Sequence, residues 1–252
     1  MNVWSPWTVP GYVKINFFIQ TIYKTLIFVG KQKMNRQMPS SHHYQLNEIL
    51  ELIIETNPGK LLDIGIGFGK YGFLSREYLE LWEPGAVYGA HKRQIDGIEA
   101  FEAYLTPLHR LIYDQIFTGD ARDILPAISD RYDLILMIDV LEHFTHEDGL
   151  KVLEECRRLG RNILISVPKI MSAQEEVYGN PYETHRFNWK QKDFSGIPDK
   201  FFLYNAKSTI CYIGEDSWRI GTILKKGNRR RTLVRILELT GLKRPLKYIF
   251  RN

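Results

Sequence analysis

Glycines and a carboxylate stand together in residues 63–72, which read DIGIGFGKYG. The last six letters match the pattern G-x-G-x-x-G, which is typical of loops whose backbone N–H groups bind the pyrophosphate of a dinucleotide. Asp63, however, comes immediately before the loop, where its carboxylate would repel phosphates. The acid expected about twenty residues after such a loop is also missing, because Glu83 comes early and no acid follows until Asp96. The pattern alone is therefore weak evidence for a dinucleotide.

Three further acids, Glu99, Asp120 and Asp139, each follow a strand-like stretch of sequence. Together with Asp63 they favour a ligand that carries positive charge and no phosphate. S-adenosylmethionine fits, because it has a sulfonium, an ammonium and a carboxylate, and glycines let the backbone approach it closely. Glu99 is placed to accept hydrogen bonds from both ribose hydroxyls, and Asp120 from the adenine amino group. We therefore expect S-adenosylmethionine to be the cofactor.

The elements that must position these acids alternate along the chain. Strand-like segments are separated by helix-like ones, of which the segment 100–112 is expected to bend or end near Pro107. This alternation predicts parallel strands, joined by right-handed crossovers, in a sheet covered on both faces. Ligands of such sheets bind outside the carboxyl ends of the strands. The four acids stand at four such ends, in the segments LLDIG, QIDGIE, DQIFTGDA and YDLILMIDV.

The blocks LLDIGIGFGKYG, IDGIE, GDA, YDLILMIDVLEHF and NILISVPK follow one another as in the class I S-adenosylmethionine-dependent methyltransferases, which the chain resembles over roughly residues 45–215. The resemblance implies an α/β, Rossmann-like, doubly wound and mostly parallel seven-stranded sheet with an antiparallel edge strand. It also implies an enzyme that transfers a methyl group to an O or N nucleophile of a small-molecule, glycan or lipid-linked acceptor. The cofactor-binding residues expected are Asp63, Gly65, Gly67, Gly69, Glu99, Asp120, Ala121 and Asp139.

His143 and Glu142, in DVLEHF just after the fourth strand, are the candidate catalytic residues. Methyl transfer is an in-line displacement at an activated carbon, so orientation of the nucleophile supplies much of the catalysis. His143 lies where the methyl group should point, and it could act as a base or position the acceptor. Glu142 would be its partner or a wall of the acceptor site. Alternatively, His143 bonds only Glu142 or a backbone carbonyl and shapes the loop.

A second resemblance concerns a divalent metal. DVLEH followed by HRFNW is similar to part of the small-RNA 3′-terminal 2′-O-methyltransferases, in which two acids and two histidines bind a metal ion. Asp139, Glu142, His143 and His185 match that set, with Asp in place of Glu at the first position. Carboxylates and imidazoles can hold Mg²⁺ or Mn²⁺. A histidine after the fifth strand is also common in methyltransferases of small molecules, so metal-assisted RNA methylation stays an alternative.

Charge divides the chain into three predicted parts. Residues 225–252 contain ten Lys or Arg and one acid, residues 1–38 contain five and no acid, and residues 39–224 carry an excess of acids. We predict a methyltransferase domain at 39–224 and a basic C-terminal tail at 225–252 with a short amphipathic helix. For the basic and apolar extension 1–38 three alternatives stay open: an interfacial helix, a packed extension, or the poorly ordered extension that we favour.

The partners and the compartment follow from the same features. The basic tail could lie on an anionic membrane surface, and nucleic acid is less favoured because the domain around the site is acidic. Two cysteines without metal-ligand spacing indicate a reducing compartment. We expect a cytoplasmic protein, or one peripheral at the inner membrane surface. A non-catalytic methyltransferase-like module, tethered to a membrane or partner by its basic ends, is the remaining alternative.

Overall fold

The computed structural model describes residues 40–227, except 83, 84, 86, 88, 172, 173, 175 and 178. The N-terminal extension 1–38, and the tail from residue 228 onward, lie outside the described residues. The predictions for both ends of the chain therefore stay predictions.

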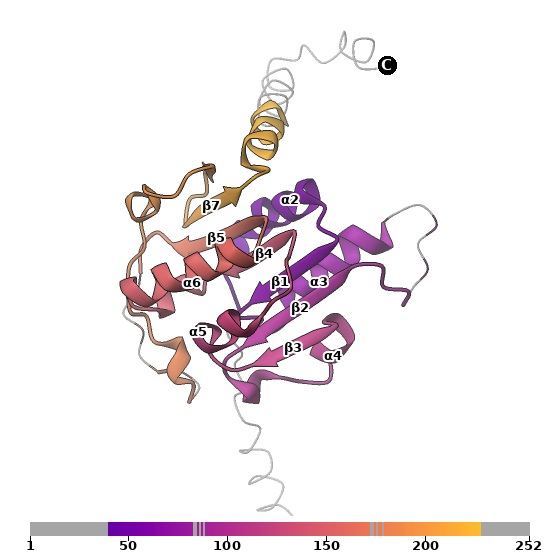
Figure 1. Cartoon of the computed structure of the whole chain (residues 1–252), viewed down its shortest axis with the longest axis horizontal. Helices are drawn as coiled ribbons and strands as arrows, with labels where there is room; N and C mark the ends of the chain where they lie inside the picture. The colour runs from indigo at the N-terminus through magenta and orange to yellow at the C-terminus, as the bar shows by residue number, and fades with distance from the viewer. Residues whose placement is uncertain are drawn as a thin grey trace, which may run out of the picture. The chain divides into compact units, whose positions relative to one another are not determined.

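Seven strands form one sheet in the order β3-β2-β1-β4-β5-β7-β6 (Figure 1). The first five run parallel, and β7 pairs antiparallel with both β5 and β6. The predicted fold class is thereby confirmed, and the reversed strand lies one position in from the edge formed by β6. The bounds are β1 Lys60–Ile64, β2 Gln94–Glu99, β3 Gln115–Thr118, β4 Leu134–Ile138, β5 Asn162–Pro168, β6 Lys200–Leu203 and β7 Ser208–Gly214.

Helices cover both faces of this sheet. The α-helices are α2 Leu46–Thr56, α3 Lys70–Arg76, α4 His109–Ile112, α5 Ala121–Ile124 and α6 His146–Leu159, and residues 217–227 are also helical. A π-helix, Glu77–Leu81, extends α3. The 3₁₀-helices are His43–Gln45, Glu102–Tyr104, Leu125–Ala127, Leu141–His143, Pro181–Glu183 and Gln191–Phe194. The helix expected at 100–112 is thus divided into two short pieces around Pro107. None of the described helices is long and apolar enough to span a bilayer.

Side chains of the central strand β4 alternate between two hydrophobic cores. Leu134 and Leu136 belong to the core covered by α2 and the helical residues 217–227, and Ile135 and Met137 to the core covered by α5 and α6. A strand buried on both faces reads as a continuous apolar run, as LILMI does. The strong burial of β4 places its carboxyl end, and Asp139 beyond it, at the middle of one sheet edge.

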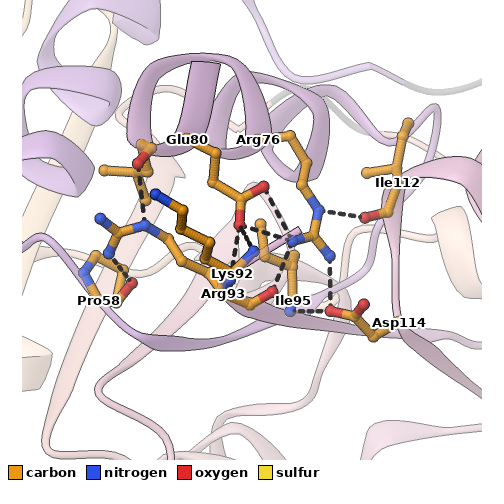
Figure 2. A network of polar contacts seen from close by, with 9 residues as sticks. Pro58, Arg76, Glu80, Lys92, Arg93, Ile95, Ile112 and Asp114 are labelled. Carbon is orange, nitrogen blue, oxygen red and sulfur yellow. Dashed lines mark hydrogen bonds and ion pairs between the residues drawn. The ribbon is translucent and has the colours of Figure 1, made fainter. Parts of the chain in front are cut away.

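A buried ion-pair network fixes the start of β2 (Figure 2). The Arg76 guanidinium donates to Asp114 Oδ2 at 2.6 Å, to the carbonyl oxygen of Arg93 at 2.7 Å and to that of Ile112 at 2.9 Å. Its neighbour Glu80 accepts from the backbone N–H of Arg93 at 2.7 Å. Because a buried guanidinium needs such partners, the network holds the loop before β2 in one register. It lies at the amino end of β2, opposite the end that carries Glu99.

Candidate functional site

A cavity of about 950 Å³ opens at the carboxyl ends of the parallel strands. It is lined by the loop after β1, the ends of β2 and β4, the residues after β3, and parts of the segment 174–186. Every predicted site residue except Gly69 contributes to its wall: Asp63, Gly65, Gly67, Glu99, Asp120, Ala121, Asp139, Glu142, His143 and His185. The sheet topology thus brings together residues that are spread over more than a hundred positions of sequence.

The glycine loop needs glycine for two separate reasons. Gly65 has a φ of 72°, and a Cβ built on it would lie 2.6 Å from Cγ2 of Val140. The residue therefore allows both a left-handed backbone and close contact with the loop after β4. Gly69, with a φ of 84°, is the N-cap of α3, and a Cβ on it would face Ile112 instead of the cavity. Gly69 thus starts the helix and does not line the site.

Asp63 is buried at the end of β1, beneath the glycine loop. The hydroxyl of Tyr113 donates to Asp63 Oδ2 at 2.7 Å. Burial and, to a smaller extent, nearby Glu99 raise the pKa of Asp63 to about 7, against the opposing effect of the Tyr113 hydrogen bond. A cation bound beside Asp63 would favour its ionised form. Within the part of the chain that the structure describes, no salt bridge joins this buried acid to a cation.

Glu99 connects the end of β2 to the glycine loop. Its Oε2 accepts from the backbone N–H of Gly67 at 3.0 Å, and its Oε1 accepts from that of Phe101 at 3.0 Å. Burial raises the pKa of Glu99 to about 7, although these backbone hydrogen bonds oppose the shift. Each carboxylate oxygen keeps a lone pair that these hydrogen bonds do not use, so the two hydroxyls of a diol could still donate to the carboxylate.

Asp120 has a partner that the sequence analysis missed. Its carboxylate caps α5 by accepting from the backbone N–H of Arg122 at 2.9 Å, and Oδ2 accepts from the Arg122 guanidinium at 2.7 Å. Burial alone would raise the pKa of Asp120, but the hydrogen bonds and charge of Arg122 hold it below its ordinary value. The acid is therefore ionised, and an adenine amino group would share it with Arg122.

Asp139, after β4, is held by two side-chain donors. Ser166 Oγ donates to its Oδ1 at 2.8 Å, and Gln45 Nε2 donates to its Oδ2 at 2.7 Å. The residue has a φ of 56°, which is unusual for a residue other than glycine. Burial raises its pKa, with the Ser166 and Gln45 hydrogen bonds acting against the shift. Gln45 comes from the segment before α2, which the sequence analysis did not connect with the site.

Glu142, His143 and His185 form a compact cluster in the wall of the cavity. One possible ligand atom from each lies within 4.8 Å of the others. Glu142 is buried, and its Oε2 has no hydrogen-bond partner among the described residues. Burial raises the pKa of Glu142 well above its ordinary value. Asp139, the fourth residue of the predicted metal set, stands outside this cluster and is bonded to Ser166 and Gln45.

His143 is neutral at physiological pH. Burial and, to a smaller extent, the neighbouring His185 lower its pKa to about 4. Its Nδ1 lies 3.3 Å from the carbonyl oxygen of Thr184 and therefore acts as the donor of that bond. The proton is thus on Nδ1, which leaves the lone pair of Nε2 available to accept a proton or bind a metal ion.

The segment after β5 is fastened to the 3₁₀-helix that carries Glu142 and His143. The backbone N–H of Arg186 donates to the carbonyl oxygen of Glu142 at 2.8 Å, and Trp189 Nε1 donates to that of Leu141 at 2.9 Å. Trp189 is almost fully buried and packs in the core. These bonds explain why His185 meets His143, although 42 residues separate them in sequence.

His109 is a further residue that the sequence analysis did not identify. Its ring is fully buried in α4. Nδ1 accepts from the backbone N–H of Thr106 at 3.0 Å, so the ring proton is on Nε2, which donates to the carbonyl oxygen of Gly67 at 2.8 Å. A short helix beyond β2 thereby supports the centre of the glycine loop. No local pattern in the sequence could connect residue 109 with residue 67.

Comparison with known protein families and with curated proteins finds no match. Among solved structures, the chain is similar to the N-terminal domain of EvdMO1 in the presence of SAH and D-fucose, with 13% identity, a TM-score of 0.49, and coverage of 69% of this chain and 84% of that one. It is also similar to the methyltransferase domain of bacterial CtHen1, with 17% identity, 68% and 98% coverage and a TM-score of 0.47.

A third similar structure is an O-methyltransferase family protein from Burkholderia thailandensis, with 12% identity, 68% and 56% coverage and a TM-score of 0.47. The fold described above rests on the strand order of this chain itself.

Proposed function

We propose that this chain is a class I S-adenosylmethionine-dependent methyltransferase that acts on an O or N nucleophile of a small-molecule, glycan or lipid-linked acceptor. One observation carries the proposal: a glycine loop and the buried acids Asp63 and Glu99 share one cavity at the carboxyl edge of the sheet. A pyrophosphate would be repelled by these acids, whereas a ligand with an ammonium and a sulfonium would stabilise their charges.

The residues present fit this cofactor. Both oxygens of Glu99 accept backbone hydrogen bonds and keep lone pairs that can accept the two ribose hydroxyls as well. Gly65 and Gly67 bring backbone close to the ligand without side chains, and Asp63 supplies negative charge beneath it. When bound, S-adenosylmethionine would supply a methyl carbon that its sulfonium already activates.

The chain's own contribution to the reaction would be orientation of the acceptor and removal of its proton. His143 is neutral and held by Thr184, so its Nε2 can take a proton from a hydroxyl or ammonium group of the acceptor. Glu142, with Oε2 unpartnered, can accept a hydrogen bond from the same group or from the imidazolium that forms. The buried surroundings strengthen both interactions because they exclude water.

Calorimetry of cofactor binding tests the proposal. Wild-type protein should bind S-adenosylmethionine, while Asp63→Ala and Gly67→Arg should each abolish binding and stay folded by circular dichroism. Asp130→Asn is a matched control, because Asp130 is an exposed acid paired with Lys60 at the amino end of β1. Retained binding in both site variants would sink the proposal, and absent binding in the wild type would favour the non-catalytic module.

The acceptor can then be sought directly. Protein incubated with isotopically labelled S-adenosylmethionine and an extract of its own host should transfer label to one pool of molecules, which mass spectrometry would identify.

The compartment is a separate part of the proposal. The buried Cys156 and Cys211, which form no disulfide, agree with a reducing compartment. We propose that this reaction takes place in the cytoplasm or at the inner membrane surface.

A second candidate function is metal-assisted 2′-O-methylation of RNA. The observation that favours it is the cluster of Glu142, His143 and His185, in which a buried carboxylate oxygen has no partner and one imidazole is neutral. A Mg²⁺ or Mn²⁺ ion would complete the bonding of that oxygen and polarise a ribose hydroxyl. Asp139 would have to leave Gln45 and Ser166 to join such a site.

A further inference from the structure

Three segments far apart in sequence meet beside the cavity and form one exposed surface. Asn205 Nδ2 donates to the carbonyl oxygen of Tyr44 at 2.7 Å. The backbone N–H of Lys169 donates to the carbonyl oxygen of Lys207 at 2.8 Å. Lys169 Nζ also donates to the carbonyl oxygen of Asn205. We define the rim surface as the side chains that these bonds hold together: Tyr44, Lys169, Ile170, Tyr204 and Lys207.

The rim surface contains large apolar and aromatic side chains that are exposed. Ile170 is 88% exposed, Tyr204 82% and Tyr44 50%. Single exposed apolar residues are common, but a group of large ones at one place often marks an interaction site. The surface belongs to a folded edge, because Asn205 is buried and the turn that contains it joins β6 to β7.

The charge of the rim surface is positive. Lys169 Nζ lies 4.9 Å from the centre of the Tyr204 ring, and Lys207 Nζ lies 5.9 Å from that of Tyr44. Within residues 40–227, as far as they are described, neither lysine forms a salt bridge with a carboxylate. Cations packed on aromatic rings and not neutralised by acids complement an anionic partner.

The rim surface borders the cavity. His42 and Pro168 line the cavity wall. His42 is two residues before Tyr44 in the chain, and Pro168 directly precedes Lys169. Pro168 is also the last residue of β5, so the surface stands at the carboxyl edge of the sheet. A partner held here would be close to the opening through which an acceptor must enter.

We infer that the rim surface docks on an anionic lipid bilayer. Tyrosine rings favour the level of the headgroups, and lysine stems can lie along apolar surface while their ammonium groups reach anionic phosphates. A nucleic acid could also use tyrosine and lysine, but Ile170 offers it neither a stacking ring nor a charge. A bilayer accommodates all five side chains. If the proposed function holds, on which this step rests, docking would present a lipid-linked acceptor to the cavity.

Co-sedimentation of the full chain with vesicles tests this inference. The protein should sediment with phosphatidylcholine vesicles that contain phosphatidylglycerol, and far less with phosphatidylcholine alone. Ile170→Ser combined with Tyr204→Ser should weaken binding about tenfold or more. Lys169→Gln combined with Lys207→Gln should weaken it about fivefold for each lysine removed, at low salt. A single-stranded RNA of matched charge serves as the competing partner.

Trp218→Ser is the matched control. Trp218 is also 82% exposed, but it follows β7, whose last residue Gly214 pairs with Asn162 at the opposite edge of the sheet. This variant should bind vesicles as the wild type does. Unchanged vesicle binding in both double variants, an equal loss in the Trp218 variant, or loss of RNA binding alone would overturn the inference. Calorimetry with S-adenosylmethionine on the same proteins reports separately on the proposed function, because vesicle binding needs no cofactor.

Discussion

The Nε2 atom of His109 lies 2.8 Å from the carbonyl oxygen of Gly67, and the His109 ring is fully buried. The opposite ring nitrogen accepts from the backbone N–H of Thr106, which fixes the tautomer. The N–H of Gly67 donates to Glu99, so both the N–H and the carbonyl group of Gly67 are hydrogen-bonded within the protein. The loop is thereby held open in advance, which reduces the conformational entropy that a ligand must overcome.

His109→Asn should weaken cofactor binding more than His109→Gln. Asparagine can still accept from Thr106 but cannot reach the Gly67 carbonyl, whereas the glutamine amide can replace the Nε2 donor. Loss of this bond should cost about 1 kcal/mol, because Gly67 is only partly buried, and the loss should appear in cofactor affinity measured by calorimetry. Thermal unfolding of both variants provides the stability control. Equal affinity in the two variants would mean that the bond to Gly67 does not position the loop.

Asp63→Asn should stabilise the free protein at alkaline pH. The folded-state pKa of Asp63 is raised to about 7 by burial, so the folded state holds a proton that the unfolded state releases near pH 4. Stability therefore falls as the pH rises from about 4 to 7. Removing this ionisation should make the variant more stable above pH 7, by up to about 4 kcal/mol, with little effect at pH 4. Urea unfolding at pH 4 and pH 8 measures the difference in the free energy of unfolding. A variant less stable than the wild type at pH 8 would contradict the raised pKa of Asp63.

Gly65→Ala should destabilise the protein through two separable effects. The added Cβ would lie 2.6 Å from Val140 Cγ2, and the φ of 72° strains any residue with a side chain. We expect a loss of about 1–3 kcal/mol in the free energy of unfolding. Adding Val140→Ala should recover the part due to collision and leave the part due to strain, which a double-mutant cycle in urea resolves. Strict additivity of the two substitutions would show that no collision occurs.

His143→Asn separates a catalytic role from a structural one. Asparagine can keep the hydrogen bond to Thr184 but lacks the Nε2 lone pair, so turnover should fall about 10²–10⁴-fold while cofactor affinity stays unchanged. Because the pKa of His143 is lowered to about 4, wild-type activity should persist below pH 6, where an ordinary histidine would be protonated. Turnover against pH with the identified acceptor checks this. An unaltered rate in the variant would leave His143 with only a loop-shaping role.

Mn²⁺ binding distinguishes the metal-assisted alternative. If Glu142, His143 and His185 hold an ion, calorimetry should detect Mn²⁺ binding that Glu142→Gln weakens at least about tenfold, and a chelator should stop turnover. Asp148→Asn, an acid at the same cavity but outside the cluster, is the matched control. RNA binding that falls steeply with salt would support the same alternative. Turnover that resists a chelator would exclude it.

The parallel strands and the acids at their ends could be predicted from sequence for a local reason. Strands such as LILMI are short apolar runs bounded by polar residues, and βαβ crossovers have one hand, so Asp63, Glu99 and Asp139 had to reach one edge. The interruption of the helix-like segment 100–112 was also predicted, because Pro107 bends or ends a helix. Its apolar spacing suits a helix, but packing of Tyr104 and His109 on different parts of the site favours two short pieces.

The sequence by itself determined the fold class, the glycine loop and which acids stand near it, because these depend on patterns within a few residues. Only the tertiary structure decided the partners of those acids: Tyr113 for Asp63, Gln45 and Ser166 for Asp139, and Arg122 for Asp120. It also decided that Glu142, His143 and His185 meet and that Asp139 stands apart. Most of these contacts join residues that are tens of positions apart, and the resulting burial sets each pKa. Except for Asp120 and Arg122, which are two positions apart, no local sequence pattern indicates these contacts or the resulting pKa values.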